Sequence, residues 1–162
     1  MSLVIDTLRT STVTEELSDA EVEILAQLFE VHDYKAGDVI AQPTGAQSDN
    51  LFILAHGDIE VKILSPGEGA TTIHVLKPGD LAGIITFVGG PASSHSATLY
   101  SVGATKVISL ERAKFETLIN SHPMIVYKVM RGVVRNVHGI VRRINVQSNE
   151  LSNYIYRTQG RY

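Results

Sequence analysis

The chain has 162 residues, of which 44% are hydrophobic and 19% charged. This composition is ordinary for one globular domain and excludes wholesale disorder. The chain has no cysteine, which excludes a disulfide scaffold, a cysteine nucleophile, a thiolate-bound iron–sulfur cluster and a cysteine zinc site. Residues 1–120 carry 7 Lys and Arg against 16 Asp and Glu, whereas residues 121–162 carry 7 against 1.

The chain lacks the sequence patterns of membrane insertion and export. Its apolar runs all fall short of the about 18 residues of a membrane span, and its N-terminus lacks the pattern of a signal peptide. We therefore expect a cytoplasmic protein without membrane contact. Its domain divides into a main body, residues 1–120, and a basic segment, residues 121–162.

The first predicted element is a short amphipathic helix over residues 19–30. Ser18 is a good N-cap, and Glu21 follows three residues later, which is the spacing of a capping box. Val22, Leu25 and Phe29 then recur at helical spacing.

From about residue 31 to 112 the pattern changes to short β segments separated by Gly, Pro, Asn and Asp. Residues 59–63 alternate between apolar and polar side chains, and residues 65–70 form a turn that predicts a hairpin. Many short strands without crossover helices predict a mainly β (α+β) fold, an antiparallel jelly roll or double-stranded β-helix barrel. The expected strands are His32–Tyr34, Val39–Ala41, Leu51–Ala55, Ile59–Leu64, Thr71–Leu76, Ala97–Ser101 and Lys106–Leu110.

The last segment predicts a long helix that begins near Pro123, a residue that suits the first helical position. From residue 126 onward, apolar residues recur in alternating steps of four and three, the spacing of a coiled-coil seam. We expect this seam to form a homodimer, and its members are Val126, Met130, Val133, Val137, Ile140, Ile144, Leu151 and Tyr154. A second apolar set would instead pack the helix on its own body: Ile125, Val129, Val141 and Ile155. The basic residues of this helix fit either a solvated face or contact with nucleic acid.

Four motifs in this order resemble the cyclic nucleotide-binding domain of the catabolite-activator and fumarate–nitrate-regulator superfamily. They are residues 34–40, 49–61, 76–83 and 94–98, each with glycines or small residues where the roll turns. The resemblance implies a β-roll flanked by an N-terminal helix and a long C-terminal dimerisation helix. It also implies a regulatory, non-enzymatic role, with a phosphate-binding cassette between two strands.

The cassette departs from the family pattern at its two ligand-defining positions. Members that bind cyclic nucleotides place a carboxylate on the ribose and an arginine on the phosphate; Ile84 and His95 stand at these positions here. Losing a hydrogen bond to a charged group costs about 1.5–3 kcal/mol, so we expect weak binding of cyclic AMP or another small nucleotide. The ligand-binding residues that the resemblance implies are Gly83, Ile84, Ile85, Thr86, His95, Ser96, Ala97 and Thr98, with Arg131 and Arg135 reaching in from the helix.

Three alternatives to nucleotide sensing stay open. The cassette could be packed shut by Ile84, Ile85 and Phe87, which would leave a ligand-free dimerisation module. A cupin-like metal enzyme is a remote alternative, because the six histidines are scattered without His-x-His spacing. Haem bound through one histidine is a further alternative, and the pattern implies no catalytic or metal-binding residues otherwise. Only eight residues follow Tyr154, so we expect no DNA binding by this chain through a helix-turn-helix.

Overall fold

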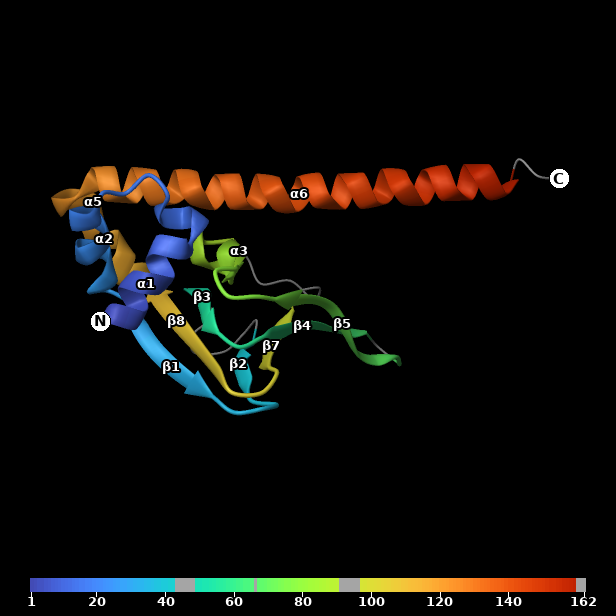
Figure 1. Cartoon of the computed structure of the whole chain (residues 1–162), viewed down its shortest axis with the longest axis horizontal. Helices are drawn as coiled ribbons and strands as arrows, with labels where there is room; N and C mark the ends of the chain where they lie inside the picture. Colours follow the sequence, from blue (N-terminus) through green and yellow to red (C-terminus); the bar gives the residue numbers. More distant parts are fainter. Residues whose placement is uncertain (43–48, 66, 91–96, 160–162) are drawn as a thin grey trace.

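The computed structural model describes residues 1–42, 49–65, 67–90 and 97–159. Two four-stranded antiparallel sheets lie below a group of helices, and one long helix runs across the top and extends beyond the body (Figure 1). The helices are α1 Ser2–Thr10, the 3₁₀ turn η1 Thr12–Thr14, α2 Asp19–Ala26, α3 Ile84–Phe87, α4 Arg112–Glu116, α5 Leu118–Ser121 and α6 Pro123–Gln159. The strands are β1 Glu30–Tyr34, β2 Val39–Ala41, β3 Asn50–His56, β4 Ile59–Ser65, β5 Gly69–Leu76, β6 Leu81–Ala82, β7 Thr98–Ser101 and β8 Thr105–Glu111.

The sheet order confirms the predicted jelly-roll type of fold. The first sheet has the order β1-β8-β3-β6 and the second β2-β7-β4-β5, so each sheet joins strands that are far apart in the sequence. The seven predicted strands are all present, and the predicted hairpin joins β4 to β5. The two-residue strand β6 was not predicted.

The central strands of the first sheet, β3 and β8, are buried on both faces, so helices, first sheet and second sheet form three layers. Alternate residues of β8 show this: Ile108 and Leu110 belong to the cluster shared with the helices, whereas Val107 belongs to the cluster between the sheets. Phe52 and Leu54 of β3 also face the space between the sheets, where they meet Leu99 of β7. The helices therefore cover the outside of a roll whose interior is filled with apolar side chains.

The N-terminal part contains more helix than the sequence pattern predicts. The capping box of α2 is confirmed: the Ser18 side chain accepts from the Glu21 N–H at 3.3 Å, and the Glu21 carboxylate accepts from the Ser18 N–H at 3.3 Å. Before it, α1 and η1 place Val4, Leu8 and Val13 in the core against the helices and first sheet. These short elements owe their stability to that packing rather than to helix propensity.

The beginning of α6 is part of the same core. Ile125 and Val129 are buried against the body, as expected for the second apolar set, whereas Val141 is 47% exposed. Val133, predicted as a dimer residue, is only 2% exposed and is not accessible to a partner, so the predicted seam is corrected there. Val126 and Met130 also pack against this cluster. The 3.5-residue period indicates an apolar helix face but not what that face contacts. In the first turns of α6, it packs against the core of the same chain.

Candidate functional site

The cassette begins at a tight junction between β6 and α3. Gly83 has a φ of 77° and lies against β3 so closely that a Cβ atom would meet the Asn50 carbonyl oxygen at 2.5 Å and the Phe52 ring at 3.2 Å. A side chain at this position is excluded by both conformation and space. The glycine therefore allows α3 to start next to the beginning of β3.

The short helix α3 is anchored on one side and exposed on the other. Phe87 is buried and its ring lies 5.5 Å from the ring of Phe115 on α4. Ile84 is partly buried against the same core cluster, whereas Ile85 is 69% exposed. The prediction that Ile85 packs the cassette shut is therefore wrong, because its side chain points to solvent.

The last turn of α3 is held by backbone hydrogen bonds and by one arginine. The Thr86 hydroxyl donates to the Gly83 carbonyl at 3.3 Å, and the Val88 N–H donates to the Ile84 carbonyl at 3.0 Å. Nη1 of Arg112 donates to the Thr86 carbonyl at 3.2 Å. This turn is thus fixed to the body from the β8–α4 junction.

The other end of the cassette leads into β7 of the second sheet. Ala97 precedes the strand, and Thr98 pairs in register with Lys62 of β4. Because Leu99 is buried between the sheets, alternation places Thr98 on the outer face of its sheet. His95 and Ser96, the predicted contacts for an anionic group, lie outside the described residues.

A comparison with known protein families decides what this arrangement is. The family model of the cyclic nucleotide-binding domain matches residues 31–122, which include both sheets and the cassette. The chain belongs to the cyclic nucleotide-binding domain family. The resemblance inferred from the four motifs is confirmed.

The proteins to which this chain is similar differ in kind. The chain is 41% identical over 61 residues to a cGMP-dependent protein kinase of Eimeria tenella, covering 38% of this chain and 6% of the kinase. It is 28% identical over 120 residues to the HTH-type transcriptional regulator Cmr of Mycobacterium tuberculosis, covering 72% of this chain and 46% of the regulator. The crystal structure of a cyclic nucleotide-binding domain from Methylobacillus flagellatus matches with a TM-score of 0.75 at 18% identity, covering 88% of this chain and 78% of that one. The chain thus spans less than half the length of these curated relatives.

In this cyclic nucleotide-binding domain, the two helix arginines predicted to reach the ligand are occupied elsewhere. Nε of Arg131 lies 3.0 Å from a Glu16 carboxylate oxygen, and its guanidinium stacks near Tyr127. Nη1 of Arg135 lies 3.3 Å from Glu16, and its Nε lies 3.8 Å from Glu15. Both arginines tie α6 to the N-terminal segment, so the structure does not bring them to the cassette.

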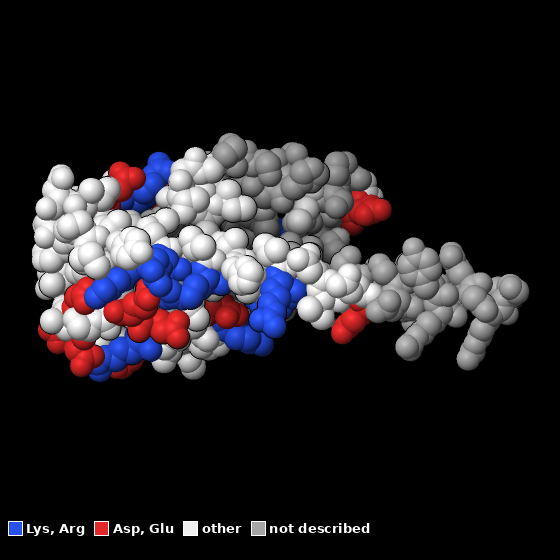
Figure 2. All heavy atoms as spheres, turned by 90° about the horizontal axis from the view of Figure 1, so that it is seen from above, with Lys and Arg blue, Asp and Glu red and all other residues white. Residues whose placement is uncertain are grey.

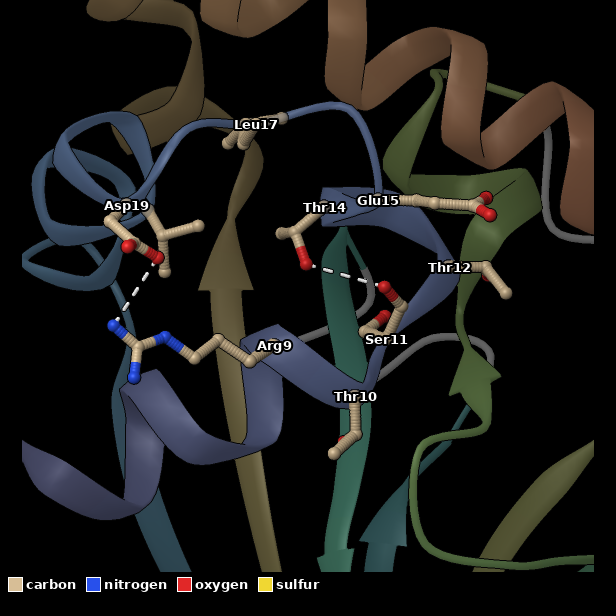
Figure 3. Close-up of a pocket in the computed structure, with 9 residues that line it drawn as sticks. Arg9, Thr10, Ser11, Thr12, Thr14, Glu15, Leu17 and Asp19 are labelled. Carbon is tan, nitrogen blue, oxygen red and sulfur yellow. Dashed lines mark hydrogen bonds and ion pairs between the residues drawn. The ribbon is translucent and has the colours of Figure 1, made fainter.

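The domain also has a polar hollow of about 390 Å³ away from the cassette, between α1, η1 and α2. In Figure 3 Arg9 extends toward Asp19 along one side, and Ser11 and Thr14 lie on the other. Their polar atoms are already used: Arg9 is 3.4 Å from Asp19, the Ser11 hydroxyl accepts from Val13 N–H, and the Thr14 hydroxyl donates to the Leu8 carbonyl. The side chains of Arg9, Ser11 and Thr14 therefore already have ion-pair or hydrogen-bond partners within the chain.

The described residues contain neither a metal-binding cluster nor a helix that could span a membrane. No group of three His, Asp or Glu side chains in them could hold a metal ion. Within the same part of the chain, no helix combines the length and apolar character needed to cross a bilayer.

Proposed function

We propose that this cyclic nucleotide-binding domain is a non-enzymatic, cytoplasmic regulatory module that binds a small ligand at its cassette and signals through α6. The observation that carries the proposal is the connection of α3 to the helices. Phe87 joins the cassette to Phe115 of α4, and the same core cluster contains Ile125 and Val129 of α6. A ligand that favours one position of α3 would thus favour one arrangement of these helices.

The proposed ligand is a cyclic nucleotide or a similar small anionic molecule, bound weakly. Family membership and the kinship with a cGMP-dependent kinase support the class of ligand. The apolar side chain of Ile84 supports weak binding, because it offers no hydrogen bond to a ribose hydroxyl. Cyclic AMP and cyclic GMP are the first probes.

The proposed output is a homodimer formed by the free face of α6. Val134, Val137 and Val141 are 64%, 39% and 47% exposed and recur at spacings of three and four residues, so they share one face of the helix. Ile140 is 36% exposed and lies at the edge of this face. Coiled-coil pairing would bury these side chains. The side chains of Ile144, Leu151 and Tyr154, also predicted for the seam, lie outside the described residues.

One observation favours a second function, a docking module without a ligand. Ile84 stands where the family resemblance places a ribose-binding carboxylate, and its side chain packs against the core instead. A cassette used only for packing would tolerate this change. The exposed Ile85 argues against a cassette that is closed throughout.

Calorimetric titration of cyclic AMP and cyclic GMP into the purified chain separates these functions. The sensor proposal predicts saturable binding with a dissociation constant between micromolar and millimolar. The variant Ile119→Ala serves as a control that should bind like the wild type, since it removes a mostly exposed apolar side chain outside the cassette and leaves the core intact. Absence of binding by both nucleotides at millimolar concentration would overturn nucleotide sensing and favour the docking module.

A further inference from the structure

Arg112 joins three elements around the cassette. It is the first residue of α4, directly after β8. Nη1 donates to the Thr86 carbonyl at 3.2 Å, Nη2 lies 3.7 Å from an Asp49 carboxylate oxygen, and Nε lies 3.8 Å from a Glu116 oxygen. One guanidinium thus contacts α3, the residue before β3, and the end of α4.

The contact with Arg112 gives the Thr86 carbonyl, which also accepts from the Gly89 N–H, a second donor that carries charge. The last carbonyls of a helix have no partner within it and carry partial negative charge. A guanidinium satisfies such a carbonyl, and its planar fork of donors can serve further acceptors in other directions. Lysine, with its single ammonium group, could not hold all three acceptors at these positions.

The turn after α3 lies beside this guanidinium. Gly89 has a φ of 87°, and a Cβ built on it would lie 3.5 Å from Nη1 of Arg112. The N–H groups of residues 88–90 donate to the carbonyls of Ile84, Thr86 and Ile85 at 3.0, 3.1 and 2.8 Å respectively. The arginine therefore lies against a fully hydrogen-bonded turn, at the point where the chain leaves α3 for the rest of the cassette.

We infer that Arg112 is a positioning residue that sets the orientation of the cassette helix relative to α4. This inference rests on the proposed function, in which the cassette binds the ligand and α4 leads on to α6. The apolar pair Phe87 and Phe115 keeps α3 on the core, and Arg112 fixes its last turn. Without the guanidinium, α3 stays attached, but its last turn and residues 88–90 lose their fixed orientation.

The test compares Arg112→Gln with the wild type by amide hydrogen exchange and by cyclic AMP titration. We expect exchange of the Val88, Gly89 and Gly90 amides to become about tenfold faster, while exchange in β8 stays unchanged. We expect cyclic AMP affinity to fall about tenfold. Arg112→Lys should restore part of the exchange protection, because an ammonium group can still donate to the Thr86 carbonyl. Arg9→Gln is the matched control, since it removes an arginine that also pairs with a carboxylate, away from the cassette.

The outcomes separate the inference from the proposed function. Unchanged exchange at residues 88–90 in Arg112→Gln overturns the inference, as does uniform acceleration throughout the chain, which marks a loss of global stability. Faster local exchange with unchanged affinity overturns the link to ligand binding. Absence of cyclic AMP binding by the wild type overturns the proposed function and the ligand part of the inference, whereas the exchange experiment still decides the positioning part.

Discussion

Gly132 determines how closely α6 approaches the N-terminal segment. A Cβ at this buried position would meet the Val13 Cα at 2.6 Å and the Thr12 carbonyl oxygen at 2.8 Å. Both atoms belong to the backbone and cannot be avoided by a rotamer change. A glycine in mid-helix costs about 1 kcal/mol relative to alanine, so the close contact with η1 is what makes it useful here.

We expect Gly132→Ala to lower the free energy of unfolding by about 1–3 kcal/mol, because overpacking must displace η1 or α6. Gly139→Ala in the same helix is the control. A Cβ there meets nothing within 4 Å, so this change should raise stability by about 0.5–1 kcal/mol through helix propensity. Urea denaturation measures both. Equal effects of the two substitutions on the free energy of unfolding would show that the contact between Gly132 and η1 leaves room for a side chain.

Ion pairs also stabilise the contact between α6 and the segment from η1 to α2. Besides the pairs of Arg131 and Arg135 with Glu15 and Glu16, Nζ of Lys128 lies 2.8 Å from Glu21. Figure 2 shows basic and acidic side chains intermixed along one side of the molecule where the long helix lies on the body. Three of the seven basic residues of 121–162, Lys128, Arg131 and Arg135, are thus paired with carboxylates of the acidic body.

This contact should weaken in acid. Partial burial would raise the pKa of Glu16, but Arg135 and Arg131 outweigh it and hold the pKa below 4.5. The hydrogen bond from Lys128 similarly lowers the pKa of Glu21. A carboxylate with a lowered folded-state pKa contributes stability that is present above the unfolded-state pKa and is lost as the pH falls through the folded-state value.

We therefore expect the free energy of unfolding to fall more steeply below about pH 4.5 in the wild type than in the double variant Glu16→Gln/Glu21→Gln. Urea denaturation at a series of pH values measures the difference, and high salt should reduce it. Parallel pH profiles would contradict the assignment of acid sensitivity to these two groups.

Local patterns predict some elements of this fold better than others. The capping box at Ser18 and the alternation over residues 59–63 depend on neighbours in the sequence, so α2 and β4 could be predicted. The short elements α3, α4 and α5 depend on distant partners, as Phe87 depends on Phe115, and periodicity over four or five residues cannot reveal them.

The candidate site, too, could be predicted from the sequence only in part. The resemblance placed the cassette at residues 83–98, and the structure confirms a helical turn there with a glycine that admits no side chain. Arg112 was missed because its partners, Asp49 and Thr86, are brought to it only by the fold. The interpretation of Arg131 and Arg135 as ligand contacts failed for a related reason: helical spacing does not show which neighbour a face meets.

At the scale of the whole molecule, the projecting half of α6 should decide the oligomeric state. We expect the wild type to sediment as a dimer at micromolar concentration and Val141→Glu to sediment as a monomer, because a charge would be placed in the exposed apolar face of Val134, Val137 and Val141. Val146→Glu is the matched control: Val146 is 50% exposed, like Val141 at 47%, but lies five residues further and on another face. A monomeric wild type, or equal effects of both variants, would contradict dimerisation through this face.

The central claim is that the roll presents an open ligand site whose chemistry has been altered at residues 84 and 95. The most direct measurement is calorimetric titration of cyclic AMP into the double variant Ile84→Glu/His95→Arg beside the wild type. Restoring two hydrogen bonds that involve charged groups, each worth about 1.5–3 kcal/mol, should tighten binding by about a hundredfold or more. A folded double variant that binds cyclic AMP no better than the wild type would contradict the claim and show that the cassette no longer serves as a nucleotide site.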